Sequence, residues 1–211
     1  MKTVKPSTRT LGWLATAVFG LGSASALAQE GSAEAGEGKS LTCGACHGTD
    51  GNSVNPIWPS LASQHAVYIV RQMEAYRDQE RNDAGMQGFA STLSEQDVLD
   101  IASYYAEQAI SAKGADPAVV GLGEQIYRGG IPEREVPACI ACHGPEGNGN
   151  ELAGYPKVSH QHATYMSTTL RAYRSGDRRS DTELNQMMRN VAELLLDDEI
   201  EALASYMQGL N

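Results

Sequence analysis

The chain has few basic residues, few aromatic residues and, beyond residue 28, no long apolar run. Its 16 lysines and arginines are outnumbered by 26 aspartates and glutamates, and the net charge of −10 excludes the basic surface that nucleic-acid binding needs. No segment after Ala28 is apolar enough to span a bilayer. Aromatic residues make up only 6% of the sequence, so much of the bulk of a packed core must come from another source.

The first 28 residues have the features of a secretory signal peptide. Lys2, Lys5 and Arg9 form a basic start, an apolar segment begins at residue 11, and Ala26-Leu27-Ala28 is a small-residue cleavage pattern. We therefore predict that residues 1–28 are removed on export to the periplasm. An uncleaved membrane anchor is the alternative, although this stretch is short for a span and is diluted by glycine, serine and threonine. Cleavage leaves 183 residues with a formal charge of −13.

The remaining sequence consists of two copies of an internal repeat. The motif C-G-A-C-H-G-T-D-G-N begins at Cys43, and C-I-A-C-H-G-P-E-G-N begins at Cys139, an offset of 96 residues. Later segments match at offsets of 97 and 102 residues, which indicates a few loop insertions. Such internal repeats predict two similar domains. We place them at residues 29–111 and 118–211, joined by a short linker at residues 112–117 that contains Gly and Pro.

Each repeat is predicted to be all-α, because apolar residues recur at helical spacing and no alternating strand pattern is present. Final helices are expected after Ser94 and Asp197, which we interpret as N-caps. Middle helices are expected at residues 63–77 and 160–174. A short helix precedes each cysteine pair, and we interpret Gly38 and Gly123 as equivalent positions where another helix crosses closely.

The Cys-x-x-Cys-His motif is the attachment signature of c-type haem. Two thiols about one helical turn apart add to the vinyl groups, and the following imidazole reaches the iron. Two covalent haems c are therefore predicted, and they would also supply core bulk. Four cysteines could instead form a shared zinc site or two disulfides, but neither requires the same complete neighbourhood around each pair. The predicted attachment residues are Cys43, Cys46, Cys139 and Cys142, with His47 and His143 as iron ligands.

The second axial ligand is predicted to be methionine. Met86 and Met188 each lie seven residues before the leucine that precedes or opens a final helix, and we expect Met86 in a loop. Met187 is an alternative to Met188, since a slip of one residue would exchange them. A second histidine, taken from His65, His160 or His162, is a weaker alternative; His65 and His162 are expected to face solvent or bond locally. Histidine and methionine together saturate the iron, which indicates electron transfer and not an enzyme.

Other residues are candidates for positions around the haems. A ligating histidine needs an acceptor for its other ring nitrogen, and the carbonyl groups of Pro59 and Pro156 are matched candidates. Side chains that could bind haem propionates are Tyr68, Tyr165, Arg71, Arg77 and Arg174.

On these motifs the sequence resembles the cytochrome c4 family over almost the whole mature chain. The resemblance implies two class I cytochrome c domains related by a pseudo-twofold axis, with the haem propionate edges facing each other. It also implies electron transfer from a quinol-oxidising cytochrome bc complex to a terminal oxidase, by a carrier that diffuses freely or associates peripherally with the membrane. The residues that carry it include Asp50-Gly51-Asn52, Tyr127 to Gly130, Pro137 to Cys139, Leu152 to Lys157, Ile200 to Leu203, and Ser205-Tyr206.

A cytochrome subunit of a dehydrogenase, acting with a sulfur-compound or flavoprotein partner, is the alternative function. An enzyme of that kind would need an open iron site or a further cysteine. All four cysteines are assigned and both irons are capped, so the sequence favours the carrier.

Overall fold

The computed structural model describes residues 1–3 and 30–211. The predicted signal peptide at residues 1–28 therefore lies almost entirely outside the described residues. In the part of the chain that is described, no helix is both long and apolar enough to cross a bilayer.

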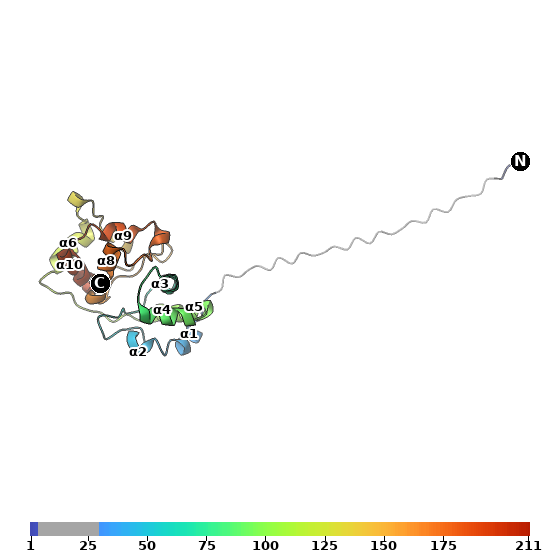
Figure 1. Ribbon diagram of the computed structural model, residues 1–211, viewed down its shortest axis with the longest axis horizontal. Coiled ribbons are helices and arrows are strands. Elements are labelled where there is room, and N and C mark those ends of the chain that lie inside the picture. Colours follow the sequence, from blue (N-terminus) through green and yellow to red (C-terminus); the bar gives the residue numbers. More distant parts are fainter. Residues whose placement is uncertain (4–29) are drawn as a thin grey trace.

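The two sequence repeats form two helical domains, and no β-strand occurs within residues 30–211. Figure 1 shows α1 to α5 grouped together and α6 to α10 grouped beside them. The predicted all-α fold is confirmed. The first domain contains α1 (Ala33–Lys39), α2 (Gly44–His47), α3 (Ala66–Arg77), α4 (Ala84–Thr92) and α5 (Glu95–Glu107). The second contains α6 (Val120–Gly129), α7 (Ile140–His143), α8 (Ala163–Ser175), α9 (Met187–Ala192) and α10 (Asp197–Gly209), with 3-10 turns η1 (Pro132–Arg134) and η2 (Thr182–Leu184).

In each domain the first helix crosses the last helix at a glycine. A Cβ atom on Gly123 of α6 would overlap the carbonyl oxygen of Ala202 in α10, and one on Gly36 of α1 would overlap that of Asp100 in α5. The prediction was correct for Gly123 but wrong for Gly38, where a Cβ atom would have no neighbour within 4 Å. The repeat register before the cysteines therefore differs by two residues from the one we assumed.

The final helix of the first domain begins where predicted, whereas that of the second begins one residue earlier and is capped differently. The Ser94 hydroxyl accepts a hydrogen bond from the N–H of Asp97 at 3.1 Å, and the Asp97 carboxylate accepts one from the N–H of Ser94 at 3.1 Å. In the second domain the N-cap is Leu196, not Asp197 as predicted. Glu199, the third residue of the helix, accepts from the N–H of Leu196 at 2.8 Å, which is the second of the two bonds of a capping box.

The middle helices α3 and α8 begin three residues later than predicted, at Ala66 and Ala163. Ser63 and His160 adopt left-handed backbone angles, with φ of 59° and 57°, which are incompatible with a continuing helix. Their N–H groups donate to backbone carbonyls in the final helix of their own domain. The two residues that follow are thereby turned toward the other domain.

Reciprocal hydrogen bonds join the domains about a pseudo-twofold axis. Gln64 donates to the carbonyl of Lys157 at 2.9 Å and accepts from its N–H at 3.0 Å. Gln161 makes the same pair with Ser60, at 2.8 and 2.9 Å. Both glutamine residues are buried, so their amide groups find in these bonds the partners that buried polar groups need.

Candidate functional site

Both Cys-x-x-Cys-His motifs form a single helical turn. Cys43 is the N-cap of α2, and Cys139 is the N-cap of α7. The N–H of His47 donates to the carbonyl of Cys43 at 3.0 Å, and that of His143 to Cys139 at 2.9 Å. The turn thus keeps both thiols and the imidazole of each motif together, as attachment of a c-type haem requires.

The alternative uses of the cysteines lack the geometry they need. No disulfide links any two of the four cysteines. Within the described residues, no three cysteine, histidine or carboxylate side chains converge as the ligands of a zinc ion would.

The two motif histidines are buried and held by backbone carbonyls. His47 donates from Nδ1 to the carbonyl of Pro59, and His143 from Nδ1 to that of Pro156, each at 2.9 Å. This confirms the predicted contacts. Burial lowers the pKa of both imidazoles, partly offset by these bonds, so the neutral form is favoured. With the proton fixed on Nδ1, the lone pair of Nε2 is available to a metal.

A continuous cavity of about 300 Å³ runs between the domains and receives side chains from both. Its lining is mainly apolar, as a porphyrin face requires. Among residues 30–211, Arg71 Nε and Gln72 Nε2 are buried without a hydrogen-bond partner, and both residues line this cavity. Unpaired buried donors beside an apolar cavity fit a ligand that is apolar with an anionic edge, and haem is such a ligand. Predicted site residues in the lining are Cys43, Cys46, His47, Met86, His143, Met187 and Met188.

The structure brings all the candidate methionines to the cavity, but Met86 lies in a helix and not in the expected loop. Asp83 caps α4 and accepts from the N–H of Met86 at 2.9 Å, which starts the helix before the methionine. Met187 and Met188 open α9, directly after Asn185 and Gln186, whose φ angles are 55° and 59°. Both remain candidates by position.

The histidines at the start of the middle helices serve the domain interface. The Nε2 atom of His65 donates to the carbonyl of Asn148, and that of His162 to the carbonyl of Ser53, each at 2.8 Å. The expectation that these side chains face solvent or bond locally was wrong, because the pseudo-twofold packing brings each against the loop that follows the other motif. His65, His160 and His162 are absent from the cavity lining, so the bis-histidine alternative has no geometric support.

The arginines differ from those expected. Arg77 donates to the carbonyls of Ala90 and Leu93 at 2.7 Å, and Arg174 donates to that of Leu195, so each holds the segment that precedes the last helix of its own domain. Neither lines the cavity. Tyr68, Tyr165 and Arg71 do line it, and their contact with propionates stays a prediction.

Sequence reasoning missed Arg81 and Arg178 at the domain boundary. Their backbones face each other in an isolated antiparallel bridge. Their separation of 97 residues equals that of Tyr68 and Tyr165, and this repeat match was the signal that could have found them.

Two helical domains, each with a Cys-x-x-Cys-His turn and a carbonyl-held histidine at a shared cavity, define a di-haem c-type cytochrome. A cytochrome c family model matches residues 33–107 and 122–211. The chain is 46% identical over 192 residues to cytochrome c4 of Thiocapsa roseopersicina, covering 90% of this chain and 98% of that protein. It belongs to the cytochrome c4 family, and it is an electron carrier with two covalently attached haems c.

Two further similarities bear on the fold and on partners. The crystal structure of reduced cytochrome c4 from Pseudomonas stutzeri superposes with a TM-score of 0.83 at 44% identity, covering 86% of this chain and 100% of that one. A thiosulfate dehydrogenase electron acceptor of Stutzerimonas stutzeri is 32% identical over 174 residues, covering 81% of this chain and 79% of that protein.

Proposed function

We propose that this cytochrome is a periplasmic electron carrier in which each haem iron has one histidine and one methionine ligand. The observation that carries the proposal is that both motif histidines and the candidate methionines line one cavity. The proposed ligand pairs are His47 with Met86 and His143 with Met188, and the proposed attachment residues are Cys43 and Cys46 for one haem and Cys139 and Cys142 for the other.

When bound, each haem supplies an iron centre that accepts one electron and gives it up again. The proposed histidine and methionine of each domain would together hold the iron and would leave no ligand position for a substrate. The carbonyl groups of Pro59 and Pro156 hold each imidazole in one orientation, which would limit its movement when the iron gains or loses an electron.

We further propose that electrons arrive from a quinol-oxidising cytochrome bc complex and leave to a terminal oxidase. This rests on the cytochrome c4 relationship. Service as the acceptor of a dehydrogenase is the second candidate, and it is favoured by the relative that is itself a thiosulfate dehydrogenase electron acceptor. Stopped-flow reduction of the purified protein by each class of donor distinguishes them, since the physiological donor will reduce it much faster than the other.

The proposed ligands are tested with the protein expressed from its full chain. Pyridine haemochrome analysis and intact mass should give two covalent haems on a polypeptide that begins near Gln29. Met86→Ala and Met188→Ala should each remove part of the ferric methionine–iron charge-transfer band. If Met187→Ala removes the second part while Met188→Ala leaves it, then Met187 is the ligand.

A further inference from the structure

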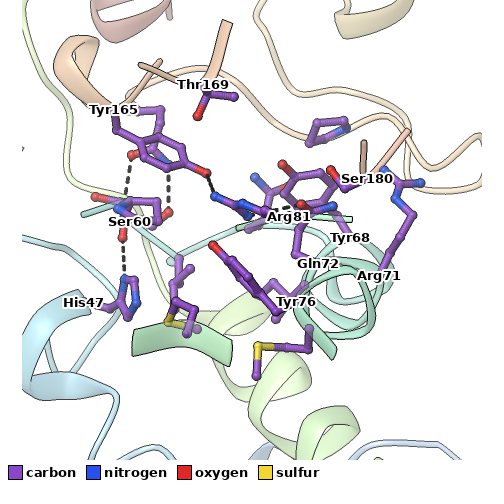
Figure 2. A pocket seen from close by; sticks show the side chains of 18 of the residues that line it. His47, Ser60, Tyr68, Arg71, Gln72, Tyr76, Arg81, Tyr165, Thr169 and Ser180 are labelled. Atoms are coloured by element: carbon purple, nitrogen blue, oxygen red, sulfur yellow. Dashed lines mark hydrogen bonds between the residues drawn. The ribbon is translucent and has the colours of Figure 1, made fainter. Parts of the chain in front are cut away.

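Arg81 and Arg178 reach across the domain boundary in opposite directions. Arg81 Nη2 donates to the hydroxyl of Tyr165 in the second domain, and Arg178 Nη2 donates to that of Tyr68 in the first, each at 2.7 Å. Both guanidinium groups also donate to Oε1 of Gln72, at 3.1 and 2.6 Å. Figure 2 shows Arg81 between Tyr165 and the Tyr68, Gln72 and Tyr76 side chains of α3.

The two guanidinium groups are enclosed by aromatic rings. Arg81 lies over the ring of Tyr76 at 4.6 Å from its centroid, and Arg178 over the equivalent Tyr173 at 4.7 Å. Arg178 is only 2% exposed and Arg81 is half-buried. Aromatic faces and hydroxyl groups attract a cation, but they do not neutralise its charge.

No carboxylate in the described part of the chain forms an ion pair with Arg81 or Arg178. A buried charge without a counter-ion is costly, by several kcal/mol. The chain is otherwise rich in acids, and other arginines use them: Arg128, Arg134, Arg171, Arg174 and Arg189 all form ion pairs. The missing counter-charge at the domain boundary therefore points to a bound anion.

The haem cavity adjoins these arginines and adds further donors. Arg81 lines it, and so do Tyr68 and Gln72, which hydrogen-bond to Arg178. The unpartnered Nε2 of Gln72 belongs to the same side chain that accepts from both arginines. The cavity also has carboxylates, but Asp83 caps α4 and Asp181 pairs with a different arginine at 2.7 Å.

We propose that Arg81 and Arg178 are the counter-ions of the haem propionates at the domain boundary and raise the reduction potentials of both haems. The inference rests on the presence of both haems. A ferric haem carries one more positive charge than a ferrous haem, so a nearby cation disfavours the oxidised state. A pair of arginines shared between the domains acts on both haems at once.

The field of the two arginines is visible at Tyr165. Although burial raises the pKa of this phenol, the charges of Arg81 and Arg178 outweigh burial and lower the pKa to about 7. Cations that favour the phenolate of Tyr165 also favour a carboxylate placed beside them.

Spectroelectrochemical titration of the holoprotein tests the proposal. Arg81→Gln and Arg178→Gln should lower both midpoint potentials, with about a tenfold change in the oxidised-to-reduced ratio at fixed potential, or 59 mV for a one-electron couple. Arg81→Lys and Arg178→Lys should restore most of the shift. Arg179→Gln is the matched control: it removes the same charge from the next residue, which is exposed and whose side chain donates to the backbone carbonyl of Gln79.

A merely structural role gives a different result. Arg77→Gln removes two hydrogen bonds inside the first domain and should lower thermal stability without a comparable shift of both potentials. If Arg81→Gln and Arg178→Gln shift the potentials no more than Arg179→Gln does, the proposal is wrong. Fewer than two haems in the unaltered protein would instead overturn the di-haem function itself.

Gln72→Glu keeps the test available if the arginine variants do not fold. It preserves the acceptor for both arginines and loses only an amide N–H group that has no partner. The new carboxylate would compete with the propionates for the arginines and should lower both potentials. Unchanged potentials in this variant would overturn the proposal.

Discussion

The crossing of α6 and α10 at Gly123 allows a sharp test of the packing. In Gly123→Ala the new methyl group would overlap the carbonyl oxygen of Ala202 and lie 2.7 Å from Cβ of Tyr206. Both neighbours are buried residues of α10, so there is little room for them to give way. Overpacking of this kind costs about 3 kcal/mol, and the better helix propensity of Ala returns about 1 kcal/mol. We expect a net loss of about 2 kcal/mol.

Gly121 provides a control two residues earlier in the same helix. Nothing lies within 4 Å of a Cβ atom there, so Gly121→Ala should stabilise the domain by up to about 1 kcal/mol. Urea and thermal unfolding of the haem-loaded protein, followed by far-UV circular dichroism, measure both variants. For a domain of this size 1 kcal/mol corresponds to roughly 4–8 °C. Gly36→Ala and Gly38→Ala form the same matched pair in the first domain. If Gly123→Ala is as stable as Gly121→Ala, the close helix crossing does not exist.

Three further perturbations probe other contacts. The buried carboxylate of Asp181 forms an ion pair at 2.7 Å with Arg189, the residue that follows Met188. Asp181→Asn removes this pair and should weaken the methionine–iron band of the second haem while sparing the first. Gln161→Leu leaves the buried backbone groups of its partner unpaired and should cost about 2–4 kcal/mol in urea unfolding. The third perturbation tests unfolding by acid. Lys39 lowers the pKa of Asp97 and of Asp100 to about 2. The stability that these ion pairs contribute is therefore present above about pH 4 and is lost as the pH falls toward 2. In Lys39→Met the free energy of unfolding should therefore fall less steeply between about pH 4 and pH 2.

Each of these has a contrary outcome. An equal loss of both methionine bands in Asp181→Asn would mean that the side chain acts on the whole fold and not on one ligand. Full stability in Gln161→Leu would mean that the interface bonds are replaced by water. If the free energy of unfolding of Lys39→Met falls between about pH 4 and pH 2 as steeply as that of the unaltered protein, other carboxylates cause the unfolding by acid.

Much of each domain could be predicted because the information lies within a short stretch of sequence. The Cys-x-x-Cys-His turns, the carbonyl contacts of Pro59 and Pro156 and the cap at Ser94 depend on residues at most 13 positions apart. Such local contacts recur in both repeats, so each copy supported the prediction for the other.

The interface between the domains could not be predicted in the same way. His65 and His162 bond to residues 83 and 109 positions away, and nothing in their local sequence distinguishes them from surface histidines. The repeat places an arginine at the position of Arg77 in both domains, which suggests a propionate ligand. In the structure this arginine instead donates to the carbonyl groups of Ala90 and Leu93 in its own domain. The alignment also placed Gly38 where Gly36 belongs, because two glycines two residues apart fit a short helix about equally well.

The reciprocal bonds of Gln64 and Gln161 have a consequence for assembly. An interface in which each side repeats the other is the isologous type found in twofold homodimers. A short tether between such halves makes their association intramolecular, at an effective concentration in the millimolar range. Docking of the two domains is therefore independent of protein concentration, and a cut in the chain between them would make it depend on that concentration.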